Sequence, residues 1–297
     1  MKVAITGASG LVGSQLRNLL IQKGIEVFSI TRSKPRTEHE IFWDYKNEKF
    51  GSLEGLDYII HLAGDNIASR WTEKKKKEIL ESRISGTEFL VETINKLKNP
   101  PKKVIFASAI GYYGNQSNEL HIEETAAGES FLAEVCKLWE QETKNLNSDI
   151  PQAIIRIGIV LSKSAGALAL MLPAFKLGVA GRLSDGKQYM SWIGLEDLIE
   201  IISFLMTSTD TGVFNCVAPN PVTNLEFTKT LSKLLKRPAI IPLPKFAGRL
   251  IFGKEFADEL LFASNRVIPA KLIEAGYQFK YPILEDCLQN ILYNSAK

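Results

Sequence analysis

Apolar residues follow two alternating patterns along the chain. Short and nearly continuous apolar runs predict buried strands, and longer stretches with helical periodicity lie between them. The strands are expected at 2–6, 26–31, 41–44, 58–63, 103–109 and 152–162, and the helices at 9–24, within 71–97 and around 130–146. This alternation is typical of a doubly wound parallel sheet in the α/β class, with helices on both faces.

The pattern changes after residue 163. The sequence there predicts a short helix, a glycine-punctuated loop, another helix and a strand, at 166–178, 181–194, 195–206 and 213–218. From residue 219 the chain is mainly helical and rich in proline. We therefore expect two domains: residues 1–218, which carry the sheet, and residues 219–297, a smaller, mainly helical domain leaning over its end.

The charge pattern argues against nucleic acid as a partner. The 36 basic residues are interleaved with 33 acidic ones, for a net charge of +3. The basic cluster at 74–77 is flanked by Glu73, Glu78 and Glu81 at helical pairing distances, which indicates a solvated helix face. No apolar stretch approaches the roughly 20 residues that span a bilayer, and the N-terminus lacks a signal-peptide pattern. We expect a cytoplasmic protein without a membrane partner.

Cysteine and histidine spacing gives no sign of a metal centre or a disulfide framework. Cys136, Cys216 and Cys287 are far apart and include no CxxC pair. The three histidines also lack metal-ligand spacing, and His61 lies in the apolar run YIIHLAG, which favours a core or strand-end position. The sequence predicts no metal site.

The segment TGASGLVG at 6–13 points to a dinucleotide. Gly7, Gly10 and Gly13 form a GxxGxxG array between the first strand and the first helix. We expect Gly7 to allow a tight turn, Gly10 to let the backbone approach a pyrophosphate, and Gly13 to let helix and strand pack closely. A merely structural turn is the less favoured alternative.

The end of the second strand predicts which cofactor binds. NAD enzymes usually carry an acidic residue there, whereas this chain has Thr31, Arg32, Ser33 and Lys34. A guanidinium can hold a ribose 2'-phosphate with two charge-assisted hydrogen bonds. NADP is therefore preferred to NAD, and the alternative is that Arg32 is only a surface charge.

Several motifs together resemble a known family. TGASGLVG, HLAG (61–64) and ASAIGYYG (107–114) are similar to motifs of the extended short-chain dehydrogenase/reductase superfamily. The chain more narrowly resembles its atypical "epimerase family" branch, which is nucleoside-diphosphate-sugar epimerase-like and has a small C-terminal domain. The motifs behind this narrower resemblance are RIGIVLS, GKQYMSWIGLEDL, APNPVTNLEFT, RPAIIPLP and RVIPAKLIEAGYQFKYP.

The resemblance implies a Rossmann-type domain that binds NADP. The cofactor residues that it implies are Gly7, Gly10, Leu11, Val12, Gly13, Thr31, Arg32, Leu62, Ala63, Gly64, Glu78, Arg83 and Val160. Gly194 departs from the branch, where WIH is common in place of WIG, so no role is carried over for a histidine there.

The catalytic pair of the superfamily is missing. Its standard members use Tyr-x-x-x-Lys on one helix face, where the ammonium lowers the pKa of the phenol. In FLAEVCKLWE (131–140), Leu132 and Cys136 occupy these positions, and a shift by one residue gives Ala133 and Lys137. Adjacent helical residues point about 100° apart, so Lys137 does not cover the Cys136 thiol, and a buried structural cysteine is favoured.

Other polar groups could replace the pair. Ser108, with Ala109 as the alternative, lies at the serine position of the superfamily, and Arg83 takes the place of its asparagine. Ser108 and Tyr113 are the catalytic candidates, and Tyr113 could equally line the nicotinamide pocket. The substrate candidates are Tyr112, Gln188, Tyr189 and Trp192. The alternative for Tyr112 is lining of the nicotinamide pocket, and for the other three it is a lid or packing role.

Two function classes stay open. In the first, the protein is an NADP-dependent oxidoreductase or epimerase-like enzyme with a non-standard active site and an unknown small-molecule substrate. In the second, it binds NADP without turnover, as a redox sensor or interaction module. Neither the substrate nor the oligomeric state can be predicted from these motifs.

Overall fold

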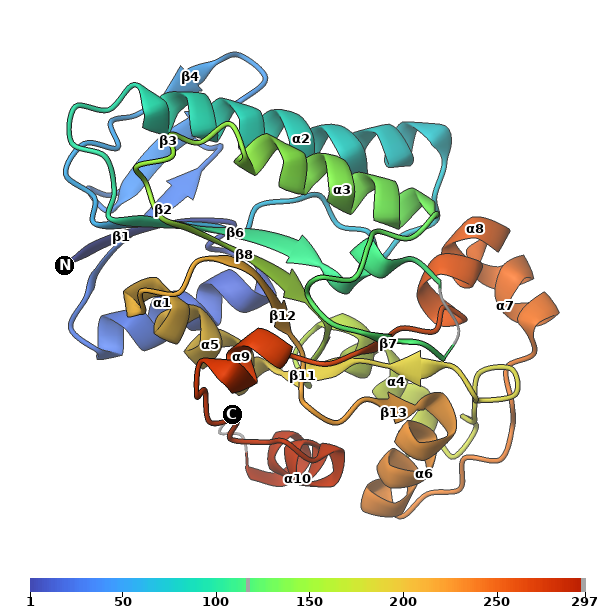
Figure 1. Ribbon diagram of the computed structural model, residues 1–297. Coiled ribbons are helices and arrows are strands. Elements are labelled where there is room, and N and C mark those ends of the chain that lie inside the picture. Colours follow the sequence, from blue (N-terminus) through green and yellow to red (C-terminus); the bar gives the residue numbers. More distant parts are fainter. Residues whose placement is uncertain (116–117, 295–297) are drawn as a thin grey trace.

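The computed structural model describes residues 1–115 and 118–294 and is built around one large sheet (Figure 1). The strand order is β12-β8-β6-β5-β1-β2-β3-β4. Neighbouring strands are parallel except for β3 and β4. The strands are β1 (Lys2–Thr6), β2 (Glu26–Thr31), β3 (Glu40–Asp44), β4 (Lys49–Phe50), β5 (Tyr58–His61), β6 (Lys103–Ala109), β8 (Gln152–Ile157) and β12 (Gly212–Cys216). The predicted Rossmann-type α/β fold is confirmed.

Helices cover both faces of the sheet (Figure 1). On one face lie α1 (Leu11–Gln22) and α5 (Leu195–Thr207), and on the other lie α2 (Glu73–Asn95) and α3 (Phe131–Thr143). The strands are buried on both sides because alternate side chains serve two separate cores: Val3 and Ile5 belong to one core and Ala4 to the other. This double burial explains why the strands read as continuous apolar runs.

The predicted strand at 152–162 is wrong as a single element. It breaks at Gly158, where a Cβ would lie 2.7 Å from the carbonyl oxygen of Ser191 and 2.7 Å from Cγ1 of Val217. After the break, β9 (Ile159–Leu161) leaves the main sheet and pairs with β11 (Trp192–Gly194). The predicted loop at 181–194 therefore contains β11 and also the short strand β10 (Tyr189–Met190).

Most predicted helices are present with shorter limits, because capping residues set their ends. The first begins at Leu11 rather than residue 9, since Gly10 is its N-cap. Side chains of Thr72 and Ser130 cap α2 and α3, and Thr223 with Glu226 forms a capping box at the start of α6 (Asn224–Leu235). The helix predicted at 166–178 is α4 (Gly166–Lys176).

The C-terminal part consists mostly of short helices. The remaining elements are η1 (Ile110–Tyr113), β7 (Leu120–His121), β13 (Val222–Thr223), α7 (Lys245–Phe252), α8 (Lys254–Phe256), η2 (Ala257–Leu261), β14 (Arg266–Val267), α9 (Ala270–Glu274), α10 (Leu284–Gln289) and η3 (Asn290–Asn294). Figure 1 shows α7 and α8 on the side toward which β6 points. The predicted domain boundary at 218/219 stays a prediction, and residues 295–297 lie outside the described part of the chain.

The C-terminal part is fastened to the start of α5 by a buried carboxylate. The two oxygens of Asp197 accept hydrogen bonds from the backbone N–H groups of Lys280 and Tyr281, at 2.8 and 2.9 Å. Across the described residues, no helix has both the length and the apolar character needed to cross a membrane.

Candidate functional site

The glycine-rich loop forms a tight turn between β1 and α1. Gly7 has a φ of +69°, and a Cβ on it would lie 3.0 Å from the carbonyl group of Leu62. A Cβ on Gly13 would lie only 2.3 Å from the carbonyl oxygen of Gly7. The structure thus gives Gly7 the turn role and Gly13 the packing role that the sequence predicts. The approach of a pyrophosphate to Gly10 stays a prediction.

The N-terminus of α1 is suited to an anion. Its N-cap is Gly10, and no side chain caps the first turn, in contrast to α2 and α3. The first backbone N–H groups of a helix lack intrahelical partners and lie at the positive end of its dipole. Leu11 and Val12, which form this first turn, are half-buried.

A threonine that was missed by the sequence analysis joins the glycine-rich loop to the next strand. The Thr6 hydroxyl oxygen accepts hydrogen bonds from the N–H groups of Leu62 and Ala63, both at 3.0 Å. It also lies 2.8 Å from Nδ1 of His61. Thr6 therefore holds the chain after β5 against the loop, and its position directly before Gly7 was the available signal.

His61 gives the fold a dependence on pH. It is fully buried, as predicted, and burial lowers its pKa from 6.5 to about 3. Below pH 6.5 the His61 side chain binds a proton in the unfolded chain but not in the folded one. The free energy of unfolding therefore decreases as the pH falls toward 3. We expect a loss of roughly 2 kcal/mol in the free energy of unfolding between about pH 6.5 and about pH 5.

Urea unfolding at a series of pH values measures this loss. His61→Asn should remove its share of the slope, whereas His39→Gln, at a half-buried histidine, should retain it. Equal slopes in the wild type and His61→Asn would contradict the assignment to His61.

The end of β2 presents a free guanidinium at the same edge of the sheet. Ile30 pairs with Thr6 in the parallel register, so Thr31 and Arg32 lie just beyond the end of β1. The Thr31 hydroxyl accepts a hydrogen bond from the N–H of Ser33 at 3.2 Å. Arg32 is exposed and forms no ion pair with any residue that the structure describes. It is therefore available to a ligand phosphate.

The chain after β5 is fixed by Arg83 from α2. One nitrogen of Arg83, Nη1, donates to the carbonyl oxygens of Asp65 and Ile79, both at 3.1 Å, and burial lowers the pKa of the guanidinium. A Cβ on Gly64 would lie 3.1 Å from Cζ of Arg83. The guanidinium also lies 5.1 Å from the ring centroid of Trp139. Arg83 thus positions the loop that contains Gly64, and whether it touches a cofactor stays a prediction.

Two further predicted cofactor residues lie on different elements. Val160, on β9, is close to the start of α4: a Cβ on Gly166 would lie 3.5 Å from the Val160 carbonyl oxygen and 3.6 Å from Cδ2 of Leu11. Val160 is thereby brought near the glycine-rich loop. Glu78 is half-buried on α2, and one of its oxygens lies 3.9 Å from Nζ of Lys75.

The positions of the missing catalytic pair are filled by packing residues. Leu132 and Cys136 are buried against η1: a Cβ on Gly111 would lie 3.3 Å from Cβ of Leu132 and 3.8 Å from the Cys136 sulfur. Burial raises the pKa of the Cys136 thiol to about 11. Lys137 is exposed, and its Nζ lies 3.7 Å from Glu134. The prediction of a buried structural cysteine is confirmed.

The catalytic candidate Ser108 belongs to a buried ionic network. Its hydroxyl donates to Oε1 of Glu140 at 2.6 Å. Arg156 donates to both oxygens of Glu140, at 2.9 Å each, and the exposed fractions of these two side chains are 3% and 9%. Sequence reasoning missed Arg156, which stands in the motif RIGIVLS, and used Glu140 only as an alignment marker.

The second catalytic candidate, Tyr113, lies in the same network. It is fully buried, Nη1 of Arg156 donates to its hydroxyl at 2.9 Å, and the hydroxyl lies 2.7 Å from Oδ1 of Asn215. Burial raises the pKa of Tyr113 to about 12. Ser108 and Tyr113 thus have structural partners for their polar groups, and the geometry lends their predicted catalytic role no support.

Of the four substrate candidates, two are buried and two are half-buried. Trp192 is fully buried and donates to the carbonyl oxygen of Asn220 at 3.1 Å. Gln188 is also buried and donates to the carbonyl oxygen of Leu183 at 3.1 Å. Tyr189 and Tyr112 are half-buried, and each ring packs against a guanidinium. In this conformation only the two tyrosines could contact a ligand.

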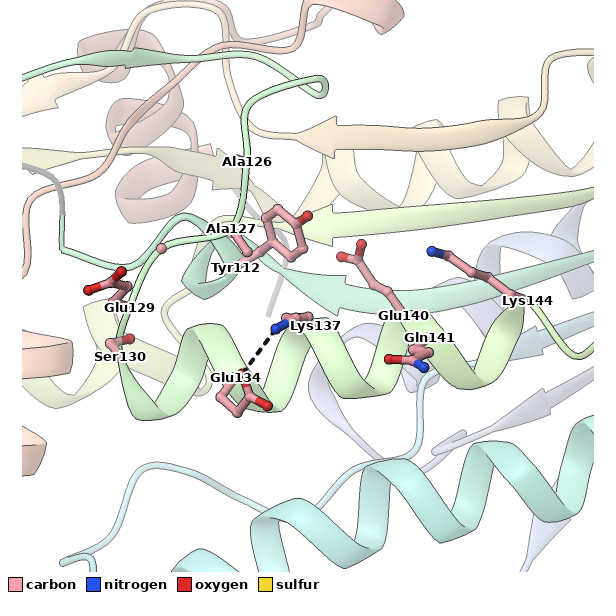
Figure 2. Close-up of a pocket in the computed structure, with 11 residues that line it drawn as sticks. Tyr112, Ala126, Ala127, Glu129, Ser130, Glu134, Lys137, Glu140, Gln141 and Lys144 are labelled. Carbon is pink, nitrogen blue, oxygen red and sulfur yellow. Dashed lines mark ion pairs between the residues drawn. The ribbon is translucent and has the colours of Figure 1, made fainter.

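Tyr112 also lines a groove of about 830 Å³ beside α3. Figure 2 shows the groove between α3 and the loop that carries Ala126, Ala127, Glu129 and Ser130. None of the lining residues comes from the glycine-rich loop or from the end of β2. In the parts of the chain that the structure describes, no group of three or more His, Cys, Asp or Glu side chains is arranged to hold a metal ion.

Comparisons with known proteins agree with this geometry. Residues 3–216 match the model of the NAD dependent epimerase/dehydratase family, and residues 243–291 match a domain of unknown function. The epimerase family protein SDR39U1 homolog, chloroplastic, from Arabidopsis thaliana is 36% identical over 304 residues, which cover 98% of this chain and 87% of the relative.

Two solved structures are similar over almost the whole chain. The human epimerase family protein SDR39U1 (isoform 2), crystallised with NADPH, has a TM-score of 0.93 and 33% identity and covers 99% of this chain and 100% of its own. A nucleoside-diphosphate sugar epimerase from Corynebacterium glutamicum has a TM-score of 0.81 and 33% identity, over 98% of this chain and 58% of its own.

Proposed function

Because the chain belongs to the NAD dependent epimerase/dehydratase family, we propose that it binds NADPH at the ends of β1, β2 and β5. The observation that carries the proposal is the exposed Arg32, which stands beside an uncapped helix N-terminus at one edge of the sheet. The helix end suits the pyrophosphate and the guanidinium suits the 2'-phosphate. The human relative that was crystallised with NADPH supports the same cofactor.

Proton transfer by a tyrosine and lysine pair is not part of this proposal. The two positions hold buried Leu132 and Cys136, and the pKa of that thiol is raised to about 11. Binding of NADPH is therefore the function that the site supports best. An oxidoreductase or epimerase-like reaction would need a proton donor outside these positions, supplied by another residue or by the substrate itself.

The cofactor preference is tested by Arg32→Asp. We expect the Kd for NADPH to rise at least about tenfold, because two charge-assisted hydrogen bonds are lost and a carboxylate faces the phosphate. The affinity for NADH should increase, since the carboxylate can accept hydrogen bonds from a free ribose. Isothermal titration calorimetry measures both, and Arg36→Asp in the same exposed loop is the matched control. Equal losses in the two variants would assign the effect to general electrostatics.

Turnover separates the two function classes. The protein with NADPH is incubated with carbonyl compounds and with nucleotide sugars, and the nicotinamide absorbance is followed. Loss of absorbance would support the oxidoreductase. Because an epimerase regenerates its cofactor and leaves the absorbance unchanged, the nucleotide sugars are also incubated with NADP+ and the products are separated by chromatography. Tight binding with neither a loss of absorbance nor a new sugar epimer would favour the redox sensor. A small-molecule substrate and a cytoplasmic location remain part of the proposal for the enzyme.

A further inference from the structure

Helix α7 carries apolar side chains on the side that faces away from the protein. Its inward side is marked by Gly248, where a Cβ would lie 2.6 Å from Cζ of Phe262. Successive helical residues are rotated by about 100°, so Phe246 and Leu250 point away from Gly248. They are 75% and 81% exposed. The outward side of a surface helix is normally polar, and here it is not.

Helix α4 repeats this arrangement. Leu168, Leu172 and Phe175 are buried on its packed side. Leu170 and Leu177 lie on the opposite side and are 73% and 77% exposed. Apolar residues on both sides of a helix are typical of a helix that is covered on both sides.

The two helices are joined through adjacent backbone segments. The N–H of Ile241 donates to the carbonyl oxygen of Ala180 at 3.2 Å, and the N–H of Leu243 donates to the carbonyl oxygen of Arg182 at 2.9 Å. The end of α4 and the start of α7 are thereby linked. We call the exposed apolar residues of this region the apolar surface: Leu170, Leu177, Val179, Ile240, Phe246 and Leu250.

Within the two segments that carry the apolar surface every charged residue is basic, and the acidic residues Asp185 and Glu255 follow directly after them. Segments 163–184 and 235–254 contain eight lysines and arginines and no aspartate or glutamate. The whole chain has a net charge of +3, so the remainder outside these segments carries −5, from 3 minus 8. Lys176, Arg182, Lys236 and Lys245 are exposed. Positive charge therefore predominates around the apolar surface, although Arg249 of α7 is paired with Asp258 at 2.8 Å.

We propose that the apolar surface binds an anionic lipid bilayer, with α7 lying in the interface. Apolar side chains with a basic surround are the combination that a membrane-surface helix uses: the apolar groups enter the boundary of the acyl chains and the cations attract the headgroups. That no helix among the described residues can span a membrane does not oppose this, because a helix lying in the plane of the membrane does not have to span it. The sequence predicts no membrane partner because its apolar runs are too short to span a bilayer, and that criterion does not apply to a helix in the interface.

Two other partners fit less well. In a dimer with two-fold symmetry, the apolar surface of one subunit would pack against the same surface of the other subunit. The basic residues around the two surfaces would then repel each other. Nucleic acid would use the cations but would leave the projecting Phe246 and Leu250 without a role, because phosphate contacts supply most of nonspecific affinity.

The experiment is vesicle flotation of the full chain, with phosphatidylcholine alone and with added phosphatidylglycerol. We expect the protein to float with the anionic vesicles only and to be released near 1 M salt, where the Debye length is about 3 Å. Lys245→Glu should lower the bound fraction at least about fivefold. The double variant Phe246→Ser with Leu250→Ser should lower it comparably at low salt. Lys77→Glu and Ile273→Ser, at other exposed positions, should float like the wild type.

Circular dichroism melts of each variant establish that the fold is retained, which is expected because all substituted side chains are exposed. The proposal is overturned if the wild type stays with the soluble fraction, or if it floats equally with neutral vesicles. It is also overturned if light scattering shows a dimer that the double variant converts to a monomer, since the occupant would then be a second copy.

Discussion

Glu140→Ala is expected to lower the free energy of unfolding by about 3–5 kcal/mol, because it leaves the Arg156 guanidinium buried without its counter-ion. Arg156 donates two hydrogen bonds of 2.9 Å to Glu140, and the pair is almost completely buried. The Ser108 hydroxyl would lose its partner as well. Urea denaturation monitored by circular dichroism measures the change.

The same helix offers a matched control. Glu134 forms an exposed ion pair with Lys137 at 3.7 Å, so Glu134→Ala should change the stability by less than about 1 kcal/mol. Replacing both buried partners, by Glu140→Leu with Arg156→Met, should recover most of the loss, since neither charge then remains unpaired. Similar losses for Glu140→Ala and Glu134→Ala would refute the account of the buried pair.

Gly13→Ala is expected to raise the Kd for NADPH at least about tenfold and to lower the free energy of unfolding by about 1–3 kcal/mol. The added Cβ would lie 2.3 Å from the Gly7 carbonyl oxygen and 2.9 Å from Cα of Ala8, so the turn must open. That movement displaces the N-terminus of α1, which we propose holds the pyrophosphate. Calorimetric titration with NADPH and a thermal melt measure the two effects.

Ser14→Ala is the control for Gly13→Ala, because it changes the next residue of α1 without placing an atom against the turn. Its hydroxyl makes only a 3.3 Å hydrogen bond to the Leu11 carbonyl oxygen within the helix. If Gly13→Ala loses stability as expected but binds NADPH as tightly as the wild type, the cofactor does not bind at the start of α1.

The sheet could be predicted from the sequence because its signal is local. Each strand is buried on both faces, so its residues form a continuous apolar run that can be recognised without knowing its neighbours. The break at Gly158 could not be predicted, since residues on both sides of it are apolar. It depends on the backbone of Ser191, which is distant in sequence.

The candidate site divides in the same way. The glycine spacing and the absence of the tyrosine and lysine pair are features of short segments and could be read directly. The network of Ser108, Glu140 and Arg156 joins positions that are 32 and 16 residues apart, and its geometry requires the folded sheet. The apolar surface was missed for a related reason: apolar residues around a helix suggest complete burial, and only the fold shows which of them face outward.

The strand order also has a consequence for the time course of synthesis. β1 emerges first from the ribosome and lies inside the sheet, with β2 and β3 added on one side and then β5, β6, β8 and β12 on the other. Each new strand of the parallel sheet can therefore pair with a strand that has already been synthesised, and no strand depends on a later one for its first neighbour. We infer that the sheet can assemble outward while the chain is still being translated, and that Lys280 and Tyr281 bind Asp197 only after the last strand of the sheet has been made.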